Sequence, residues 1–426
     1  MKDSNITSIT KRSIYLLFFI LITYSYTATA QSEITITNFL KSIKESNQVK
    51  MDSNTVTLLK DYNYNLPIIK NVQFRTETSD LILDRQEYTL RVKPNSLRAI
   101  SNQKKTYQNK IEEIIIKNQL KFNEELKRRY LLLVDYYFTD KLIELNTEKH
   151  IQITDKLQVL SQSIFEINFD VKDLIEAEDE LIETNLKLIN LKESRINQLS
   201  LIKQALNIQS DSVKIIFNDL ITPVEIIDKP IQDSISNEQL NITLQKLKLY
   251  VLENEMELTA AKSKQILEYV QARYGGKKND LFDENFSLGF GINLPFFGDT
   301  RSRKGDYYIK ILNEESKLAS LTEKNDVMEK QVFKEFNEAK TNYQILKKQI
   351  DESSVLLILE AYKKMEGIPP LQLLRLKNLQ NKKRIAVLKS EHLLYKSYIN
   401  TLANLEILFQ IPLRNYLSSS KELIDP

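Results

Sequence analysis

Apolar side chains recur every three or four positions along most of the 426-residue chain, which is the spacing of one face of an α helix. The longest such stretch runs from residue 96 to 165. No proline lies between 95 and 222, and proline breaks helix interiors, so an uninterrupted helix is allowed. Asn95 and Ser96 directly precede it and are suitable N-caps. At about 1.5 Å per residue the predicted helix is roughly 100 Å long.

The same pattern occurs a second time, at an offset of about 200 residues, which indicates an internal duplication. Each copy is predicted to contain a short helix, a long helix and a return helix. In the first copy these are 34–61, 96–165 and 171–207, and in the second 236–265, 299–366 and 371–409. The chain is therefore divided into a first repeat, a linker, a second repeat and a C-terminal tail, at 31–210, 211–235, 236–412 and 413–426.

Between the short and the long helix of each repeat, apolar and polar residues alternate one by one, at 68–93 and 266–296. This period of two predicts two strands in each region. Strands of about 9–11 residues with one apolar face are typical of membrane β-barrels, while a soluble hairpin packed on the helices fits the alternation equally well. In a barrel the lipid-facing residues are Tyr88, Leu90, Val92, Phe286, Leu288, Phe290, Ile292 and Leu294.

The last strand begins the stretch FSLGFGINLPFFGD at 286–299 and carries the strongest of these signals. Gly is rare in the chain, with 7 residues in all, yet two of them lie in this strand. Ser287, Gly289, Gly291 and Asn293 alternate with its apolar residues. We predict that these small residues face the interior of a barrel and keep it open.

Four strands in one chain are too few to close a barrel. Open sheet edges are not tolerated in lipid, because unpaired backbone groups have no water to bind there. Several copies of the chain together can supply enough strands. The sequence therefore predicts a symmetric oligomer.

The N-terminus has the layout of a secretory signal peptide, predicted at 1–30. Lys11 and Arg12 precede an apolar run, and Ala28 and Ala30 form a small-residue cleavage site. The alternative is a membrane anchor. The run of ~13 apolar residues is short compared with the about 20 that a spanning helix needs, which favours the signal peptide.

Composition removes several functional classes. The 60 Lys and Arg nearly balance the 57 Asp and Glu, which gives no electrostatic case for nucleic acid. Cys is absent, so there is no disulfide and no Cys-based metal site. His150 and His392 are interpreted as isolated and solvated, and the basic runs 127–129 and 381–384 as helix-surface charge. We expect no enzymatic activity and no cofactor.

With these features in place, the chain from about 33 to 412 resembles the TolC family of outer-membrane efflux and secretion channels. The resemblance is carried by the duplicated layout, by LPFFGD before the second long helix, and by two segments at the hairpin turns. These segments are NFDVKDLIEAED at 168–179 and GIPPLQLLRLKN at 367–378. The sequence departs from the family at Ile167, where Gly is usual, at Gln372, where an acid is usual, and at Leu376, where Ala is usual.

The resemblance implies a mainly helical fold in which long hairpins form a coiled-coil tunnel. Four strands per chain then contribute to a 12-stranded transmembrane barrel of a homotrimer in outer-membrane lipid, with the helices extending into the periplasm. The implied function is the passive exit duct of a tripartite efflux pump or type I secretion system, for small molecules or proteins. Its partners are a periplasmic adaptor protein and an inner-membrane transporter. The alternative is a periplasmic coiled-coil adaptor or structural interaction protein.

The hairpin tips are implied to form the gate and to meet the adaptor. An acidic ring at a constricted tip selects cations, while a solvated charged helix face is the simpler interpretation of the same residues. The predicted tip and gate residues are Asp170, Asp173, Glu176, Gly367 and Gln372.

Overall fold

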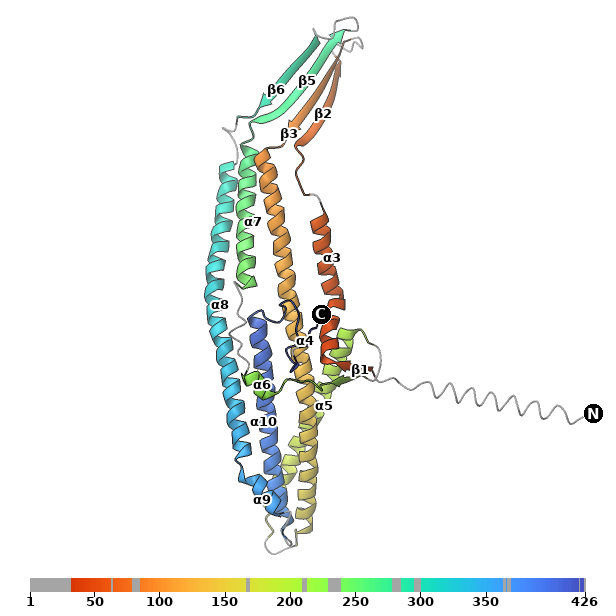
Figure 1. Cartoon of the computed structure of the whole chain (residues 1–426), viewed down its shortest axis with the longest axis vertical. Coiled ribbons are helices and arrows are strands. Elements are labelled where there is room, and N and C mark those ends of the chain that lie inside the picture. The colour runs from red at the N-terminus through yellow and green to blue at the C-terminus, as the bar shows by residue number, and fades with distance from the viewer. Residues whose placement is uncertain are drawn as a thin grey trace, which may run out of the picture.

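The chain is an elongated bundle of helices with a small sheet at one end and helical hairpin tips at the other (Figure 1). The structure is a computed structural model. It describes residues 32–62, 64–78, 85–165, 169–208, 213–228, 239–277, 285–294, 300–362, 365, 369–420 and 422–424. The predicted signal peptide, 1–30, lies outside these residues.

The longest helix, α4 (Leu97–Gln162), runs nearly the full length of the helical part (Figure 1). The Ser96 hydroxyl accepts a hydrogen bond from the Ala99 N–H at 3.4 Å and caps its first turn, as its position after Pro94 predicts. Leu126, Tyr130 and Leu133 on α4 are fully buried and belong to the main core at mid-height.

Shorter helices stack in pairs beside α4. In Figure 1, α3 (Asn47–Asp61) lies above α5 (Val171–Leu206), and α7 (Leu240–Ser263) lies above α10 (Pro370–Asn404). Helix α4 packs against both stacks, whereas the second long helix, α8 (Thr300–Asp351), packs against α7 and α10. The layer therefore has the order α3/α5, α4, α7/α10, α8, with α8 at one edge and α3/α5 at the other.

The second long helix is shorter than predicted. Helix α8 (Thr300–Asp351) ends well before residue 366, and a separate helix, α9 (Ser354–Tyr362), follows it. The Ser353 hydroxyl accepts hydrogen bonds from the Val355 N–H at 3.3 Å and from Lys383 Nζ at 2.7 Å. The prediction of one helix over 299–366 is therefore wrong, because a local serine cap starts a new helix at this point.

The predicted short helix 34–61 is also wrong. The segment begins with β1 (Ser32–Thr35), continues with α2 (Ile36–Lys41) and a 3₁₀ turn, η1 (Ser42–Glu45), and only then enters α3. Strand β1 pairs in parallel with β4 (Val213–Ile216) of the linker. This pairing joins residues about 180 positions apart, and helical periodicity carries no information on such partners.

The linker and the C-terminal tail belong to the core. Helix α6 (Pro223–Asp228) follows β4, and Ile221 and Ile226 are fully buried. In the tail, Leu413 and Leu417 are buried in the same cluster. Both segments close over the level where the stacked helices meet.

The sheet combines one hairpin from each repeat. Its strands are β2 (Ile69–Thr78), β3 (Arg85–Pro94), β5 (Leu267–Lys277) and β6 (Phe286–Ile292), in that order and all antiparallel. Strands β3 and β5 join the two repeats. A mainly helical chain with a small β part is thus confirmed. No helix in the described ranges is long and apolar enough to cross a membrane.

Candidate functional site

One face of the sheet is apolar across all four strands. The register aligns Phe74 with Leu90, Leu90 with Ala272, and Ala272 with Leu288. Leu288 and Phe290 are 74% and 72% exposed, so this face lacks a covering layer within the chain. Of the predicted lipid-facing residues, seven lie in β3 or β6, and Leu294 lies two residues beyond the end of β6. The apolar and aromatic ladder residues of this face, among which Thr76 also lies, are Val72, Phe74, Tyr88, Leu90, Val92, Val270, Ala272, Tyr274, Phe286, Leu288 and Phe290.

The opposite face is polar and centred on Arg91. Its guanidinium donates hydrogen bonds to Gln271 Oε1 at 3.1 and 2.9 Å and lies over the Tyr269 ring, 4.1 Å from the ring centre. A Cβ on Gly291 would lie 2.3 Å from that ring, so only glycine allows this approach. Gly291 lies on this polar face, and Tyr269 occupies the space beside it. That the small residues of this strand keep a barrel interior open stays a prediction.

Both outer strands of the sheet are unpaired within the part of the chain that the structure describes. Strand β2 forms one edge and β6 the other. Because the four strands alternate in direction, β2 and β6 run antiparallel to each other. A β6 strand can thus pair with the β2 strand of a second copy and continue the antiparallel order.

The edge helix α5 carries an uncovered apolar stripe. Ile175, Ile182, Ile189 and Ile196 follow one another at seven-residue intervals and are 53–67% exposed. The buried residues of α5 lie on the opposite side of the helix, toward the layer, where Leu188 is one of them. An isoleucine every seventh residue is the pattern of a coiled-coil seam, so this face is shaped to pack against another helix.

The other edge helix, α8, has the same arrangement. Val332, Phe336 and Tyr343 are buried toward α10 and its neighbours. On the far side of α8, apolar residues are 50–64% exposed at Ile309, Leu312, Val327 and Ile345. Apolar area removed from water stabilises an interface by roughly 25 cal/mol per Å². Both edges of the helical layer therefore favour a further partner.

At the tip, α5 and α10 run in parallel and are joined by ion pairs in matching positions. Asp173 Oδ2 accepts from Arg375 Nη2 at 2.6 Å, a pair separated by 202 residues. Seven residues along each helix, Glu180 Oε1 lies 2.9 Å from Lys382 Nζ, with the same separation. The duplication thus places equivalent positions of the two repeats side by side, and these pairs hold the two hairpins together.

Glu180 is the centre of this contact. Its carboxylate also binds Lys149 Nζ of α4 at 3.0 Å and accepts from the Asn378 side chain. Burial raises the pKa of Glu180, but the hydrogen bonds from Lys382, Lys149 and Asn378 together outweigh it and lower the pKa to about 2. One step further along, Lys187 lies near Lys389, where burial and the neighbouring ammonium groups lower the pKa of Lys187.

The predicted tip residues differ in their roles. Asp170 caps α5 by accepting from the Lys172 N–H at 2.9 Å, and Glu176 lies 3.8 Å from Lys172 Nζ. Gln372 is exposed in the first turn of α10, and Gly367 lies outside the described residues. Sequence reasoning missed Glu180 and its partners. The seven-residue spacing of 173 and 180, repeated at 375 and 382, was the available signal.

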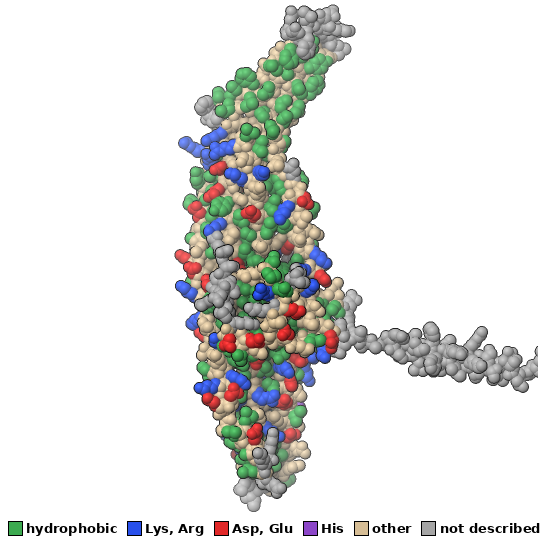
Figure 2. Space-filling view, viewed as in Figure 1, with side chains coloured by type: hydrophobic (Ala, Val, Ile, Leu, Met, Phe, Trp, Pro, Cys, Tyr) green, Lys and Arg blue, Asp and Glu red, His purple; other side chains and the backbone are tan. Residues whose placement is uncertain are grey.

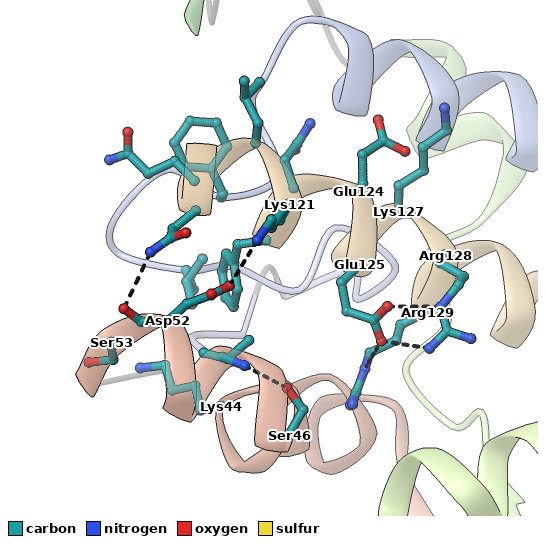
Figure 3. A pocket seen from close by; sticks show the side chains of 18 of the residues that line it. Lys44, Ser46, Asp52, Ser53, Lys121, Glu124, Glu125, Lys127, Arg128 and Arg129 are labelled. Carbon is teal, nitrogen blue, oxygen red and sulfur yellow. Dashed lines mark hydrogen bonds and ion pairs between the residues drawn. The ribbon is translucent and has the colours of Figure 1, made fainter. Parts of the chain in front are cut away.

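A groove of about 2300 Å³ lies at the level where the stacked helices meet and has both polar and apolar side chains in its wall. Figure 3 shows Asp52 of α3 facing Lys121 of α4, at 3.7 Å, and Glu125 bound to Arg128 and Arg129. These charges pair with each other along its wall. The groove is wide and open rather than shaped around a small ligand.

Two charged positions differ from prediction. Arg129 is 2% exposed, and its Nη1 donates to the Phe39 carbonyl at 2.8 Å and to Ser42 Oγ at 2.6 Å. The surface assignment of 127–129 is therefore wrong at Arg129. His392 is also not solvated, because its Nε2 lies 2.6 Å from Asp135 Oδ1 and its ring stacks on Phe138. No cluster of three potential metal ligands occurs among the residues described.

No family model matches the sequence. No curated protein matches it either. Solved structures do match over nearly the whole chain. The outer-membrane channel OprN superposes with a TM-score of 0.64 at 12% identity, covering 87% of this chain and 89% of its own. A membrane protein from Pseudomonas aeruginosa gives 0.61 at 10% identity, with 87% and 93% coverage. The outer membrane protein VceC from Vibrio cholerae gives 0.58 at 9% identity, with 87% and 96% coverage.

The chain has the fold of the TolC-type outer-membrane channels.

In this TolC-type fold the apolar sheet and the ion-paired tips lie at opposite ends of the molecule (Figure 1). The likeness extends over about nine-tenths of each chain. At 9–12% identity it establishes the fold, and the residues that act must be argued from their own geometry.

Proposed function

We infer that the chain is one subunit of a homotrimeric outer-membrane channel. In this role it forms the passive exit duct of a tripartite efflux pump or type I secretion system. The observation that carries the proposal is that the sheet and the helical layer are both left open at both edges. An open sheet edge and an uncovered apolar helix face each cost free energy in an isolated chain.

The two edges are different surfaces, so copies associate head to tail. Such a contact closes into a ring when the rotation per copy fits. Three copies give 12 strands, an even number that keeps every neighbour antiparallel. In the same ring, α8 of one copy packs against the α3/α5 stack of the next.

The ring explains the two faces of the sheet. With the apolar face outward, Leu288 and Phe290 contact lipid, while Arg91 and Tyr269 line the interior. The barrel then lies in the outer membrane and the helices extend into the periplasm. The tips face the inner membrane, where an adaptor and a transporter are the proposed partners.

The tip contacts supply a gate in this proposal. Asp173–Arg375 and the Glu180 network hold the α4/α5 hairpin against α10. A partner that separates the hairpins must break these ion pairs, so its binding energy drives the opening. Asp170, Glu176 and Gln372 lie at the same end and are proposed to form the entrance around them.

The test compares two substitutions that introduce an arginine, one on each face of the sheet. Phe290→Arg places a cation against lipid at a cost of roughly 2–4 kcal/mol per chain, and we expect loss of the protein from the outer-membrane fraction. Ser287→Arg is the matched control, because Ser287 lies on the polar face opposite Arg273. Normal membrane insertion of Phe290→Arg, or a wild-type protein that is a soluble periplasmic monomer, contradicts the proposal.

A further inference from the structure

The helix ends that adjoin the sheet carry an excess of positive charge. Segments 95–105, 257–268 and 300–306 together hold eight Lys and Arg but only three Asp and Glu, whereas the whole chain has 60 against 57. The three helices whose ends adjoin the sheet, α4, α7 and α8, all contribute (Figure 1). We call these eight residues the basic collar: Arg98, Lys104, Lys105, Lys262, Lys264, Arg301, Arg303 and Lys304.

The charges of the collar are available to a ligand. Arg98 lies 3.8 Å from Glu257, and the other seven form no ion pair with any described residue. Of the nearby acids, Glu257 also accepts from Asn102, and Glu268 lies 3.7 Å from Lys93. Elsewhere on the helices, acidic and basic side chains form ion pairs, such as Lys110 with Glu255 at 2.6 Å. The collar is thus a net cationic surface.

Helix stability does not account for the cations at the start of α8. Arg301, Arg303 and Lys304 lie in the first turns of α8, which has no acid in its first turn. Positive charge at a helix N-terminus opposes the helix dipole, at a cost of roughly 0.3–1 kcal/mol per residue. The cost at Arg301, Arg303 and Lys304 can be offset by an anion outside the chain.

The collar borders the apolar face of the sheet. Figure 2 shows hydrophobic side chains spread over the sheet and Lys and Arg side chains directly below them on the same face. The segments that connect the strands at their other end have the opposite charge balance in the sequence. Segments 79–84 and 278–284, which connect the strand pairs and lie outside the described residues, contain five Asp and Glu and one Lys. The excess of cations is confined to the helical side of the sheet.

We propose that the basic collar binds the anionic head groups of phospholipids, of the phosphatidylglycerol class, in the leaflet that faces the helices. The proposal rests on the proposed function, since it requires the sheet to lie in a membrane. A membrane-inserted apolar band ends where head groups begin, which is the level of the collar. Each Lys or Arg near an anionic lipid surface contributes ~1 kcal/mol, or about fivefold in affinity.

The test uses the purified full chain reconstituted in two kinds of vesicle, phosphatidylcholine alone and phosphatidylcholine mixed with phosphatidylglycerol. Flotation measures insertion, and native mass spectrometry of the re-extracted protein measures which lipid stays bound. We expect retention of phosphatidylglycerol over phosphatidylcholine by at least tenfold at low salt, falling as salt screens the charges. The triple variant Arg301→Gln, Arg303→Gln, Lys304→Gln should lower this preference at least fivefold.

The control variant is Lys324→Gln, Lys330→Gln, Lys377→Gln, which removes the same charge from exposed helix positions away from the collar. It should keep the wild-type preference. Insertion into both vesicles with equal retention of the two lipids overturns the collar proposal and leaves the proposed function standing. Equal losses in the two triple variants overturn it as well. Insertion into neither vesicle contradicts the proposed function, and the collar proposal with it.

Discussion

The two long helices α4 and α8 come from equivalent places in the two repeats, yet their surroundings differ. Helix α4 buries 17 of its 66 residues, including Asn123, Arg129 and Thr139. Helix α8 buries four of its 52: Ile311, Val332, Phe336 and Tyr343. The difference follows from position, since α4 packs between two helix stacks and α8 has one on a single side.

This difference supports the proposal that the chain is one subunit of a larger assembly. A monomeric helix with one buried face normally has a polar outer face. Helix α8 instead exposes Ile309, Leu312 and Val327, and α5 at the other edge exposes an isoleucine every seventh residue. An assembled ring gives α8 the second partner that α4 already has within the chain.

The largest expected effect is on the free energy of unfolding, which an alanine substitution should lower much more in α4 than in α8. Leu133 of α4 is fully buried, and Leu133→Ala should lower the free energy of unfolding by about 2–5 kcal/mol. Ile309 of α8 is 61% exposed, and Ile309→Ala should change the stability of the single chain by less than about 0.5 kcal/mol. Urea midpoints followed by circular dichroism of dissociated protein check both. Similar losses would mean that α8 is not an edge.

Substitutions at exposed apolar residues of the edge helices should instead weaken the oligomer and leave the fold of the single chain intact. Ile182→Asn with Ile189→Asn removes two side chains from the α5 stripe, each worth roughly 1.5–3 kcal/mol if it is buried by a neighbour. We expect dissociation of the oligomer with little change in the fold of the chain, measured by light scattering in detergent. Asn185→Ala and Asn190→Ala, exposed on the same helix, form the control. An intact oligomer would place the interface elsewhere.

The tip contacts should have a smaller, local effect. Glu180→Gln leaves Lys149, whose side chain is 14% exposed, without its acid and should cost about 1–3 kcal/mol locally. Hydrogen exchange of the first turns of α5 should accelerate. Glu176→Gln is the control, because Glu176 is 59% exposed and 3.8 Å from its partner. Equal exchange in the two variants would remove Glu180 from the proposed gate.

The smallest effect is a pH response at the tip. The pKa of Glu180 is lowered from 4.5 to about 2, so its contribution is complete above about pH 4.5 and is lost as pH falls toward 2. Since the chain has no cysteine, labels at Lys172→Cys and Lys377→Cys report the distance between α5 and α10. That distance should widen over this range, and Glu180→Gln should abolish the Glu180 step. An unchanged distance in wild-type protein contradicts the assignment.

The comparison also shows what sequence can predict. Helices and strands with a strong apolar period could be predicted from the sequence. Their signals, such as apolar spacing without proline and the N-cap Ser96, lie within a single element. The break after Asp351 was missed although Ser353 supplies a cap, since neither Pro nor Gly marks it. The pairing of β1 with β4 was missed because it joins distant segments.

The candidate site divides in the same way. Alternation alone selected Leu288 and Phe290 on the apolar face of the sheet. It did not show that Tyr269 fills the space beside Gly291, because that contact depends on the register of two strands. Glu180 appeared as one acid in a charged run, and only the packing of α4, α5 and α10 distinguishes it from Glu176.

The number of copies in the assembled protein tests the central claim most directly. Native mass spectrometry of the protein extracted from outer membranes with mild detergent measures it without any substitution. The open edges of the sheet and of the helical layer predict a single species of three copies. A monomer or a dimer in this extract, or protein found only in the soluble periplasmic fraction, would contradict the account.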